Sequence, residues 1–420
     1  MRYSLVSFLA CPICHGNLAT VVVGERPALM LARPRVTSGL VAPEGAIVAP
    51  LEPCTQASGV RAILDRYAAS PGSAARDGEV EVETGLLVCQ ACARWFPVTG
   101  FLPELLPDHL RDRQRDARTF EECTRGLPPD LVGGLRAGPT GAESSAADQG
   151  ASHKRAEIGI SAKVDDPHFF SPGYSSPFNS HNTEFTLYLI KLFGAAVPLL
   201  ELKGGEVLLD SGCGYAWTTE WLYRAGVEAI GVDICRTYLE IGIERMGADR
   251  PHLVVADVEN LPIRGVSMDA IFAFESAHHI PDRKKAMAGF GRVLKAAGRM
   301  VLAEPGSAHE HAQVAVDVMN KYGILEKGMD LEDVHDYVAG TQMGRPEQIF
   351  LLRASEQELG RTVDRVFVQT HSAVEGNLFR ISRSESLLDT VRSAWREPRR
   401  VVWPKVKRRV KAALARLGLE

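Results

Sequence analysis

Three carboxylates and two glycines have the spacing of a nucleotide-binding site. Asp210 ends a short apolar run, and Gly212 and Gly214 follow it in the turn that leads into a predicted helix. Glycine lacks a Cβ, so the backbone of such a turn can approach a ligand closely. Asp233 and Asp257 end the next two predicted strands, where they can bind a ribose and the amino group of an adenine. Because ligands bind at the carboxyl ends of strands in open α/β sheets, these five residues are expected to share one site.

A nicotinamide-dependent oxidoreductase is the main competing interpretation, since it uses the same first turn and the same ribose carboxylate. Its fingerprint needs a third glycine or an alanine for close packing of the helix on the strand, and this chain has Trp217 there. The carboxylate of Asp210, two residues before Gly212, suits a ligand with a methionine tail better than a pyrophosphate. The turn therefore favours S-adenosylmethionine.

Four cysteines form two pairs that could bind a metal ion. The pairs are Cys11-Pro-Ile-Cys14 and Cys89-Gln-Ala-Cys92. Four thiolates complete the tetrahedral coordination of Zn²⁺, so a site of this kind would be structural. The gap between the pairs is longer than in an ordinary zinc ribbon because residues 24–78 form an insertion rich in Ala, Pro and Gly. A redox-active pair or unligated buried thiols are the alternatives.

Polar groups after the fourth predicted strand could act on an acceptor. Glu275, His278 and His279 follow that strand, and Glu304 ends the next one. Histidine titrates near neutral pH and is a common general base. The alternative is structural: one imidazole packs against the sheet, the other caps the next helix, and the carboxylates bind loop backbone.

Strands and helices alternate in the second half of the chain, which predicts a mostly parallel sheet covered by helices on both faces. We expect a Rossmann-like, doubly wound α/β fold with seven strands, the last of them antiparallel, and a small β-rich zinc ribbon before it. Residues 305–360 are expected to form a helical cap, with His309 and His311 on its surface. The predicted strands are residues 207–210, 229–233, 253–256, 270–274, 300–303, 363–370 and 378–381.

The remaining segments divide the chain into four parts. Residues 3–10 are interpreted as a strand of the ribbon, in preference to a secretory signal, and 111–124 as a helix. Gly, Pro, Ala and Ser in residues 126–150 indicate a linker. The predicted parts are a zinc-ribbon domain at 1–110, a helix and linker at 111–165, a catalytic domain at 166–385 and a basic amphipathic tail at 386–420.

Composition limits the class of protein. A chain of 420 residues with 45% hydrophobic residues can bury a full core, and its net charge of -4 gives no overall positive field for nucleic acid. We find no apolar run near the roughly 18 residues that cross a bilayer, so no transmembrane segment is expected. Eight cysteines, four of them in metal-like pairs, suit a reducing compartment, and we expect a cytoplasmic protein.

Residues of about 180–305 resemble class I S-adenosylmethionine-dependent methyltransferases of the type 11 kind. The motifs that carry this resemblance are Asp210-x-Gly212-x-Gly214, Asp233, Asp257, Glu275-Ser-Ala-His278-His279 and Arg292-Val-Leu-Lys-x-x-Gly298-Arg. The resemblance implies that the glycine turn holds the methionine part of S-adenosylmethionine and Asp233 its ribose. The expected cofactor-binding residues are Asp210, Gly212, Gly214, Asp233, Ile234, Asp257, Val258 and Phe274, and the expected catalytic residues are His278, His279 and Glu275.

The N-terminal cysteine pairs and the sequence that surrounds them resemble small zinc-ribbon proteins that bind and activate methyltransferases. Trp95-Phe-Pro-Val-Thr-Gly-Phe-Leu-Pro-Glu-Leu-Leu follows the second pair. The resemblance implies structural zinc on Cys11, Cys14, Cys89 and Cys92, and a module that stabilises the catalytic domain or shapes its substrate entrance.

The predicted function is methyl transfer to an O or N atom, or a C atom, of a small molecule or a glycan or lipid-linked intermediate. One alternative is an RNA methyltransferase that recognises its substrate through the ribbon, and another is a non-catalytic scaffold that binds the cofactor. The basic tail suits an anionic membrane surface or nucleic acid, or it packs on the domain as an ordinary helix. The sequence leaves the acceptor and the oligomeric state open.

Overall fold

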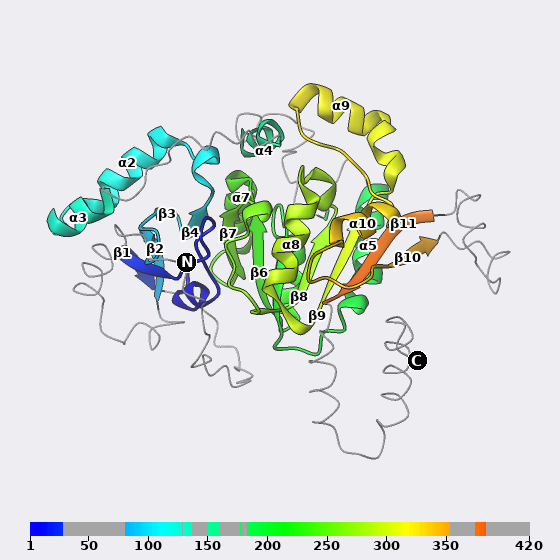
Figure 1. Ribbon diagram of the computed structural model, residues 1–420, viewed down its shortest axis with the longest axis horizontal. Helices are drawn as coiled ribbons and strands as arrows, with labels where there is room; N and C mark the ends of the chain where they lie inside the picture. The colour runs from blue at the N-terminus through cyan, green and yellow to red at the C-terminus, as the bar shows by residue number, and fades with distance from the viewer. Residues whose placement is uncertain are drawn as a thin grey trace, which may run out of the picture.

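The computed structural model describes residues 1–27, 80–127, 129–136, 150–159, 177–178, 183–352 and 374–383. Their strands form one sheet of eleven, in the order β1-β2-β3-β4-β7-β6-β5-β8-β9-β11-β10 (Figure 1). Most of the insertion at 24–78, the predicted strand at 363–370 and the tail at 386–420 lie outside the described residues.

Seven strands form the Rossmann-like part of the sheet, which is the number predicted, but β10 lies in the predicted cap and not at the predicted residues 363–370. β5 to β9 are parallel, β11 runs antiparallel to β9, and β10 pairs antiparallel with β11. The strands are β5 (Val207–Ser211), β6 (Glu228–Asp233), β7 (His252–Ala256), β8 (Met268–Phe274), β9 (Leu294–Glu304), β10 (Glu347–Leu352) and β11 (Val374–Ser382).

Helices cover both faces of the central strands, which explains why β5 and β7 are buried along their whole length. Every residue of β5 is buried. Leu208 and Leu209 are adjacent in this strand but belong to different hydrophobic clusters, because successive side chains point to opposite faces of the sheet. The cluster of Leu209 includes residues of α8, whereas that of Leu208 includes residues of α5 and α6. The main helices are α5 (Thr183–Ala196), α6 (Trp217–Arg224), α7 (Arg236–Met246) and α8 (Arg283–Val293).

The segment after β9 forms the expected cap over only part of its predicted length. It contains α9 (Gln313–Tyr322) and α10 (Leu331–Val338), and α9 lies above the sheet in Figure 1. The prediction of a cap up to residue 360 is wrong, because Glu347–Leu352 is strand β10 and pairs with β11. After α10 the chain re-enters the sheet at Glu347, nine residues beyond Val338.

The ribbon joins the Rossmann-like part of the sheet edge to edge. β1 (Leu18–Pro27), β2 (Val80–Cys89), β3 (Trp95–Thr99) and β4 (Leu102–Leu105) pair antiparallel in sequence order. β4 then pairs in parallel with β7, with Glu104 opposite Val255 and Leu105 opposite Ala256. The sequence predicts both parts but not this junction.

The N-terminal segment is not the strand that we expected. Tyr3–Ser7 is a 3-10 helix, η1, in which Leu5 is buried and Ser7 is exposed. Leu9, four residues after Leu5, is also fully buried. Buried residues four apart with an exposed one between them fit a helical turn, because in a strand residues 5, 7 and 9 would share one face.

The described residues between 111 and 159 include three helices, where the sequence predicts one followed by a linker. α2 (Arg113–Thr124) is the predicted helix, and the carboxylate of Asp112 caps it. α3 (Pro129–Arg136) and α4 (Ala151–Ile158) fall in the expected linker segments. α3 forms despite two glycines because Leu135 is fully buried against a cluster that includes Phe120.

One stretch contradicts the expectation that no apolar run approaches membrane-spanning length. Thr183–Leu200, which comprises α5 and η5 (Val197–Leu200), has 18 residues, a mean hydropathy of 1.4 and a 28% buried share. Its length and composition alone would let it cross a membrane, but a helix packed on a protein core passes the same test. Here Leu189 and Leu192 pack in the cluster that contains Phe272.

Candidate functional site

A cavity of about 590 Å³ lies beyond the carboxyl ends of the central strands. It brings together residues from the first glycine turn, the ends of β6 and β7, and the loop after β8. All the predicted cofactor-binding and catalytic residues line it except Asp210 and Phe274. Those that line it are Gly212, Gly214, Asp233, Ile234, Asp257, Val258, Glu275, His278 and His279.

The two glycines of the turn have different physical roles. A Cβ on Gly212 would lie 2.6 Å from the Cβ of Ser276, and the φ angle of +68° also disfavours other residues. A Cβ on Gly214 would have no atom within 4 Å. Gly212 is therefore needed for packing, whereas Gly214 borders open space that a ligand can occupy.

Asp233 holds the glycine turn in place. Its carboxylate accepts hydrogen bonds from the backbone N–H of Gly214 and of Cys235, each at 2.8 Å. Burial raises the pKa of Asp233 to about 7, against the effect of these two bonds. Each carboxylate oxygen has a second acceptor position, so the group can still accept a hydrogen bond from a ribose hydroxyl.

Asp257 lines the cavity with its side chain already bonded. It accepts from the Asn260 amide at 2.6 Å and from Nζ of Lys154 at 3.1 Å. Lys154 lies on α4 and also contacts Glu259. Although burial opposes its charge, the two carboxylates raise the pKa of Lys154. Sequence reasoning missed Lys154, because its partners are more than 100 residues away and its segment has the composition of a linker.

Asp210 and Phe274 do not reach the cavity. Oδ2 of Asp210 accepts from the hydroxyls of Thr218 and Thr219 at 2.6 Å each, which ties β5 to the start of α6. Burial raises the pKa of Asp210 to about 6. Phe274 packs edge-on against the ring of Trp217 in the core. Both residues contact the start of α6 and so stabilise the glycine turn without lining the cavity.

The carboxylate of Glu304 organises the loop after β8. It accepts hydrogen bonds from the backbone N–H groups of Ser276, Ala277 and His278, and it lies 2.8 Å from Nδ1 of His278. Burial raises the pKa of Glu304 to about 7 and holds the pKa of His278 well below its usual value. His278 is therefore a neutral imidazole whose ring is fixed by Glu304.

Glu275 is half-buried at the start of this loop. Its φ angle of +49° is a strained conformation for a residue other than glycine, and such strain is common at functional sites. Burial and the neighbouring Glu304 raise the pKa of Glu275 to about 8, although the Tyr188 hydroxyl donates to its carboxylate at 3.3 Å. A carboxyl group with this pKa can exchange a proton near neutral pH.

The cap adds two polar residues that sequence reasoning did not place in the site. His309 lines the cavity, which corrects the expectation that it lies on the surface, whereas His311 is exposed as expected. Nε2 of His309 lies 2.8 Å from the carboxylate of Glu326, which also lines the cavity. His309 lies on the 3-10 helix η8 (Ser307–His311) and Glu326 on an irregular segment, so only the fold brings them together.

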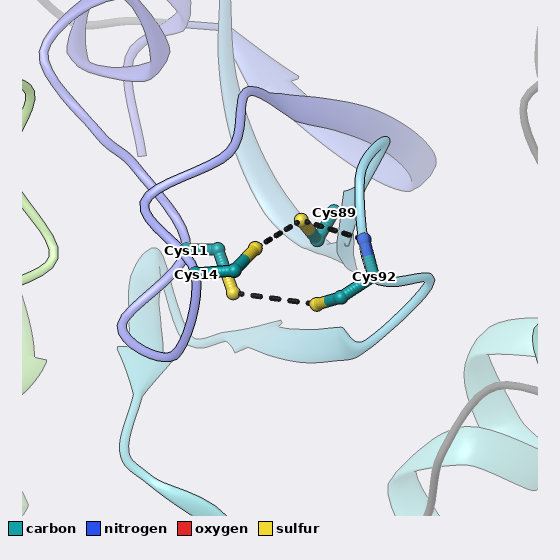
Figure 2. Close-up of side chains that lie close together, drawn as sticks. All are labelled: Cys11, Cys14, Cys89 and Cys92. Atoms are coloured by element: carbon teal, nitrogen blue, oxygen red, sulfur yellow. Dashed lines mark hydrogen bonds between the residues drawn. The ribbon is translucent and has the colours of Figure 1, made fainter. Parts of the chain in front are cut away.

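The four ribbon cysteines meet at one point, as Figure 2 shows. The Sγ atoms of Cys11 and Cys92 are 3.7 Å apart and those of Cys14 and Cys89 are 3.5 Å apart, with all four within 4.8 Å. Zn–S bonds of about 2.3 Å in a tetrahedron place sulfur atoms ~3.8 Å apart. The thiol set therefore fits a closed structural zinc site, in which each knuckle supplies two ligands.

Residues 209–302 match the family described as a methyltransferase domain, and residues 2–100 match the family described as Trm112p-like protein. The first match covers the glycine turn and β6 to β8, and the second covers β1 to β3 of the ribbon and the four cysteines. The glycine turn fits S-adenosylmethionine, and the thiol cluster fits zinc.

Known methyltransferases are similar to parts of this chain. Methyltransferase GfsG of Streptomyces halstedii is 31% identical over 163 residues, which cover 38% of this chain and 59% of that protein. The O-methyltransferase cnsE of Penicillium expansum is 33% identical over 112 residues, or 25% and 40% of the two chains. The 27-O-demethylrifamycin SV methyltransferase of Amycolatopsis mediterranei is 33% identical over 111 residues, or 25% and 41%. The chain spans less than two thirds of the length of each of these relatives.

Among solved structures, the geranyl diphosphate C-methyltransferase of Streptomyces coelicolor is 14% identical. It covers 57% of this chain and 100% of its own, with a TM-score of 0.41.

Proposed function

We propose that this chain is an S-adenosylmethionine-dependent methyltransferase that methylates an O or N atom of a small molecule. The observation that carries the proposal is that the glycine turn, Asp233, Glu275 and the histidine pair line one cavity. A single space therefore holds both a cofactor-binding turn and groups that can receive an acceptor. Its volume of about 590 Å³ lies within the range of roughly 300–1,000 Å³ that is usual for ligand pockets.

Methyl transfer from a sulfonium is an in-line displacement, so catalysis depends on holding the acceptor atom close to the methyl group. Glu275, with a pKa of about 8, is suited to take a proton from the acceptor. His278 and His279 lie on the same loop and flank the acceptor space. The 3-10 turn that carries both rings is fixed by the backbone bonds to Glu304.

The acceptor is proposed to be largely apolar. Phe185 and Val314 line the cavity and are 39% and 56% exposed, which places apolar side chains at its mouth. Val318 and Ile324 continue this surface inward. The names of two relatives also point to apolar organic acceptors, a demethylated rifamycin and a demethylated menaquinone.

An RNA acceptor fits this cavity less well. Among the described residues that line it, Lys154 is the one lysine or arginine, and two carboxylates neutralise it. The acidic residues that line it are Glu157, Asp233, Asp257, Glu259, Glu275 and Glu326. A surface of this sign repels a phosphate backbone.

The Trm112p-like domain is proposed to act within the chain as a structural support for the cofactor end of the cavity. Its strand β4 pairs with β7, the strand that leads to Asp257. Arg236 of α7 also reaches across, since it donates to the backbone of Thr99 at 2.8 Å and contacts Glu104. The thiol pairs suit a reducing environment, so we propose a cytoplasmic location.

Calorimetric titration with S-adenosylhomocysteine tests the cofactor site. Zinc-loaded wild type should bind one equivalent of S-adenosylhomocysteine. Asp233→Ala should lose most of this affinity, because it removes the hydrogen bond to the Gly214 N–H that holds the turn and the proposed acceptor for the ribose. Asp317→Ala, at an exposed position on α9, is the matched control and should bind as wild type. Absence of binding to folded wild type would refute the proposed function, and binding would justify a methylation screen with apolar hydroxyl and amine acceptors.

A further inference from the structure

Three imidazoles and a carboxylate surround one point on the acceptor side of the cavity. Ligand atoms of His278, His279 and Glu326 all lie within 4.8 Å of one another. The rings of His278 and His279 are 4.0 Å apart, and that of His309 is 5.2 Å from His278. The residues come from the loop after β8, the turn after β9 and the segment before α10, so the fold assembles this cluster.

The hydrogen bonds of the two adjacent histidines leave the same ring nitrogen available on each. Nδ1 of His279 lies 2.7 Å from the carbonyl oxygen of Leu325. A carbonyl only accepts, so Nδ1 carries a proton, and Nε2 is the nitrogen left for a metal ion. The same Nδ1 lies 3.7 Å from the carboxylate of Glu157 and 3.8 Å from that of Glu326, and these carboxylates raise the pKa of His279 although burial opposes its charge. Nδ1 of His278 likewise lies 2.8 Å from the carboxylate of Glu304, which already accepts three backbone N–H groups. Histidines that bind metal ions are oriented in this way by a carboxylate or a carbonyl.

The lone pair of His278 faces another acceptor. Its Nε2 lies 3.5 Å from Oε2 of Glu326. Since Nδ1 of His278 carries the proton, two acceptors oppose each other at a distance that is too long for a good hydrogen bond. Nε2 of His309 lies 2.8 Å from the same carboxylate and orients it. Two opposed acceptors at a buried position are stabilised by a cation between them.

The cluster is held rigidly. Arg283 donates to the backbone carbonyl of His278 at 2.9 Å and to that of Gly328 at 3.3 Å, and it also bonds the carbonyl of Lys327. The N–H of Lys327 in turn donates to the carbonyl of His278 at 3.1 Å. The segment that carries Glu326 is thus fixed to the loop that carries the histidines, as a preformed ligand set requires.

We propose that His278, His279 and Glu326 bind a divalent transition-metal ion, such as Zn²⁺, on the acceptor side of the cavity. Two imidazoles and one carboxylate form a ligand set that suits Zn²⁺, Fe²⁺ or Co²⁺ and disfavours Mg²⁺ and Ca²⁺, which prefer oxygen ligands. Metal–ligand bonds of about 2.1 Å would draw the three atoms to roughly 3–3.5 Å from one another. The site is separate from the ribbon cysteines and has coordination positions left for a substrate.

This inference rests on the proposed function and narrows its substrate class to acceptors whose hydroxyl oxygen binds the ion directly. An oxygen bound to such an ion loses its proton more readily, and the proton passes to Glu275, which lines the same cavity. The oxygen then forms a bond to the methyl carbon while the carbon–sulfur bond breaks and its electron pair goes to sulfur. The products are the methyl ether and neutral S-adenosylhomocysteine, so charge and atoms balance. The apolar mouth and the acidic interior together fit a phenol or an enol carried on an apolar skeleton.

Cobalt titration of the full chain tests the site. The protein is dialysed against a mild chelator that leaves zinc in the four-cysteine ribbon, and Co²⁺ is then added while absorption is recorded. Wild type should take up one Co²⁺ per chain with ligand-field bands and without the sulfur-to-cobalt charge-transfer band of a thiolate site. Glu326→Gln and His279→Asn should weaken this binding more than about 100-fold, since even changes in supporting residues cost 10–100-fold. His311→Asn, two residues from His309 on the same turn but exposed, is the matched control and should bind as wild type.

Each outcome decides the proposal. It is overturned if wild type binds no Co²⁺ beyond the ribbon, or if Glu326→Gln and His279→Asn bind as tightly as wild type. Titration of the same variants with S-adenosylhomocysteine shows that they are folded, because the glycine turn and Asp233 are unchanged. If wild type does not bind S-adenosylhomocysteine, the proposed function is refuted, whereas the cobalt result still decides whether the metal site exists.

Discussion

The affinity for S-adenosylhomocysteine should rise with pH through the titration of Asp233. In the ligand-free protein, burial raises the pKa of this carboxyl group to about 7. About a tenth of the molecules then carry the ionised group at pH 6 and about nine tenths at pH 8. Ribose hydroxyls donate hydrogen bonds to the carboxylate, so binding favours the ionised form. The affinity at pH 6 should therefore be about tenfold lower than at pH 8.

Isothermal titration calorimetry in two buffers of different ionisation enthalpy measures both the affinity and the protons released. Wild type should release protons on binding at pH 6 and almost none at pH 8. Asp233→Asn keeps one acceptor oxygen but cannot ionise, so it should bind more weakly and lose this part of the pH dependence. The nearby Glu157 and His279 affect the same pKa and are retained in the variant. Equal affinities at pH 6 and pH 8, or the same pH slope in Asp233→Asn, would refute this role of the carboxyl group.

Three further predictions concern stability. Removal of zinc by a strong chelator should lower the Tm in calorimetry and zinc should restore it, because metal binding contributes folding free energy; an unchanged Tm would contradict a structural site. Glu81→Gln should cost about 3–5 kcal/mol in urea denaturation, since it leaves buried Arg250, 2.7 Å away, without its ionic partner. Glu347→Gln, which removes the exposed pair with Arg380, is the control and should cost under about 1 kcal/mol. Gly231→Ala, in strand β6, should cost about 1–3 kcal/mol, because the new Cβ would lie 2.8 Å from the side chains of Cys213 and Leu253; full stability would show that these side chains can move aside.

Local sequence patterns were sufficient to predict the central sheet. Strands such as β5 and β7 are buried along their whole length, so their apolar residues form short unbroken runs that end in a carboxylate. The glycine turn and Asp233 adjoin these strands and could be placed with them, although their binding roles stay predictions.

The parts that could not be predicted depend on contacts between distant segments. Lys154 meets Asp257 across 103 residues, and Glu326 meets His309 from a segment without periodicity. Gly344 and Pro346 before strand β10 indicate a turn, but only the pairing with β11 shows that residues 347–352 are a strand of the sheet and not part of the cap. In each case the deciding energy comes from tertiary packing, which local propensity does not contain.

The parallel pairing of β4 with β7 has a consequence for how the chain can be divided. β7 is the outermost strand on its side of the Rossmann-like sheet, and the edge that faces away from β6 would be unpaired without β4 of the ribbon. An unprotected strand edge pairs readily with other chains and promotes aggregation. The covalent link keeps the partner of that edge at a high effective concentration from the time of synthesis. The ribbon therefore protects this edge from self-association. We expect that residues 166–385 expressed without the ribbon aggregate under conditions in which they are still folded.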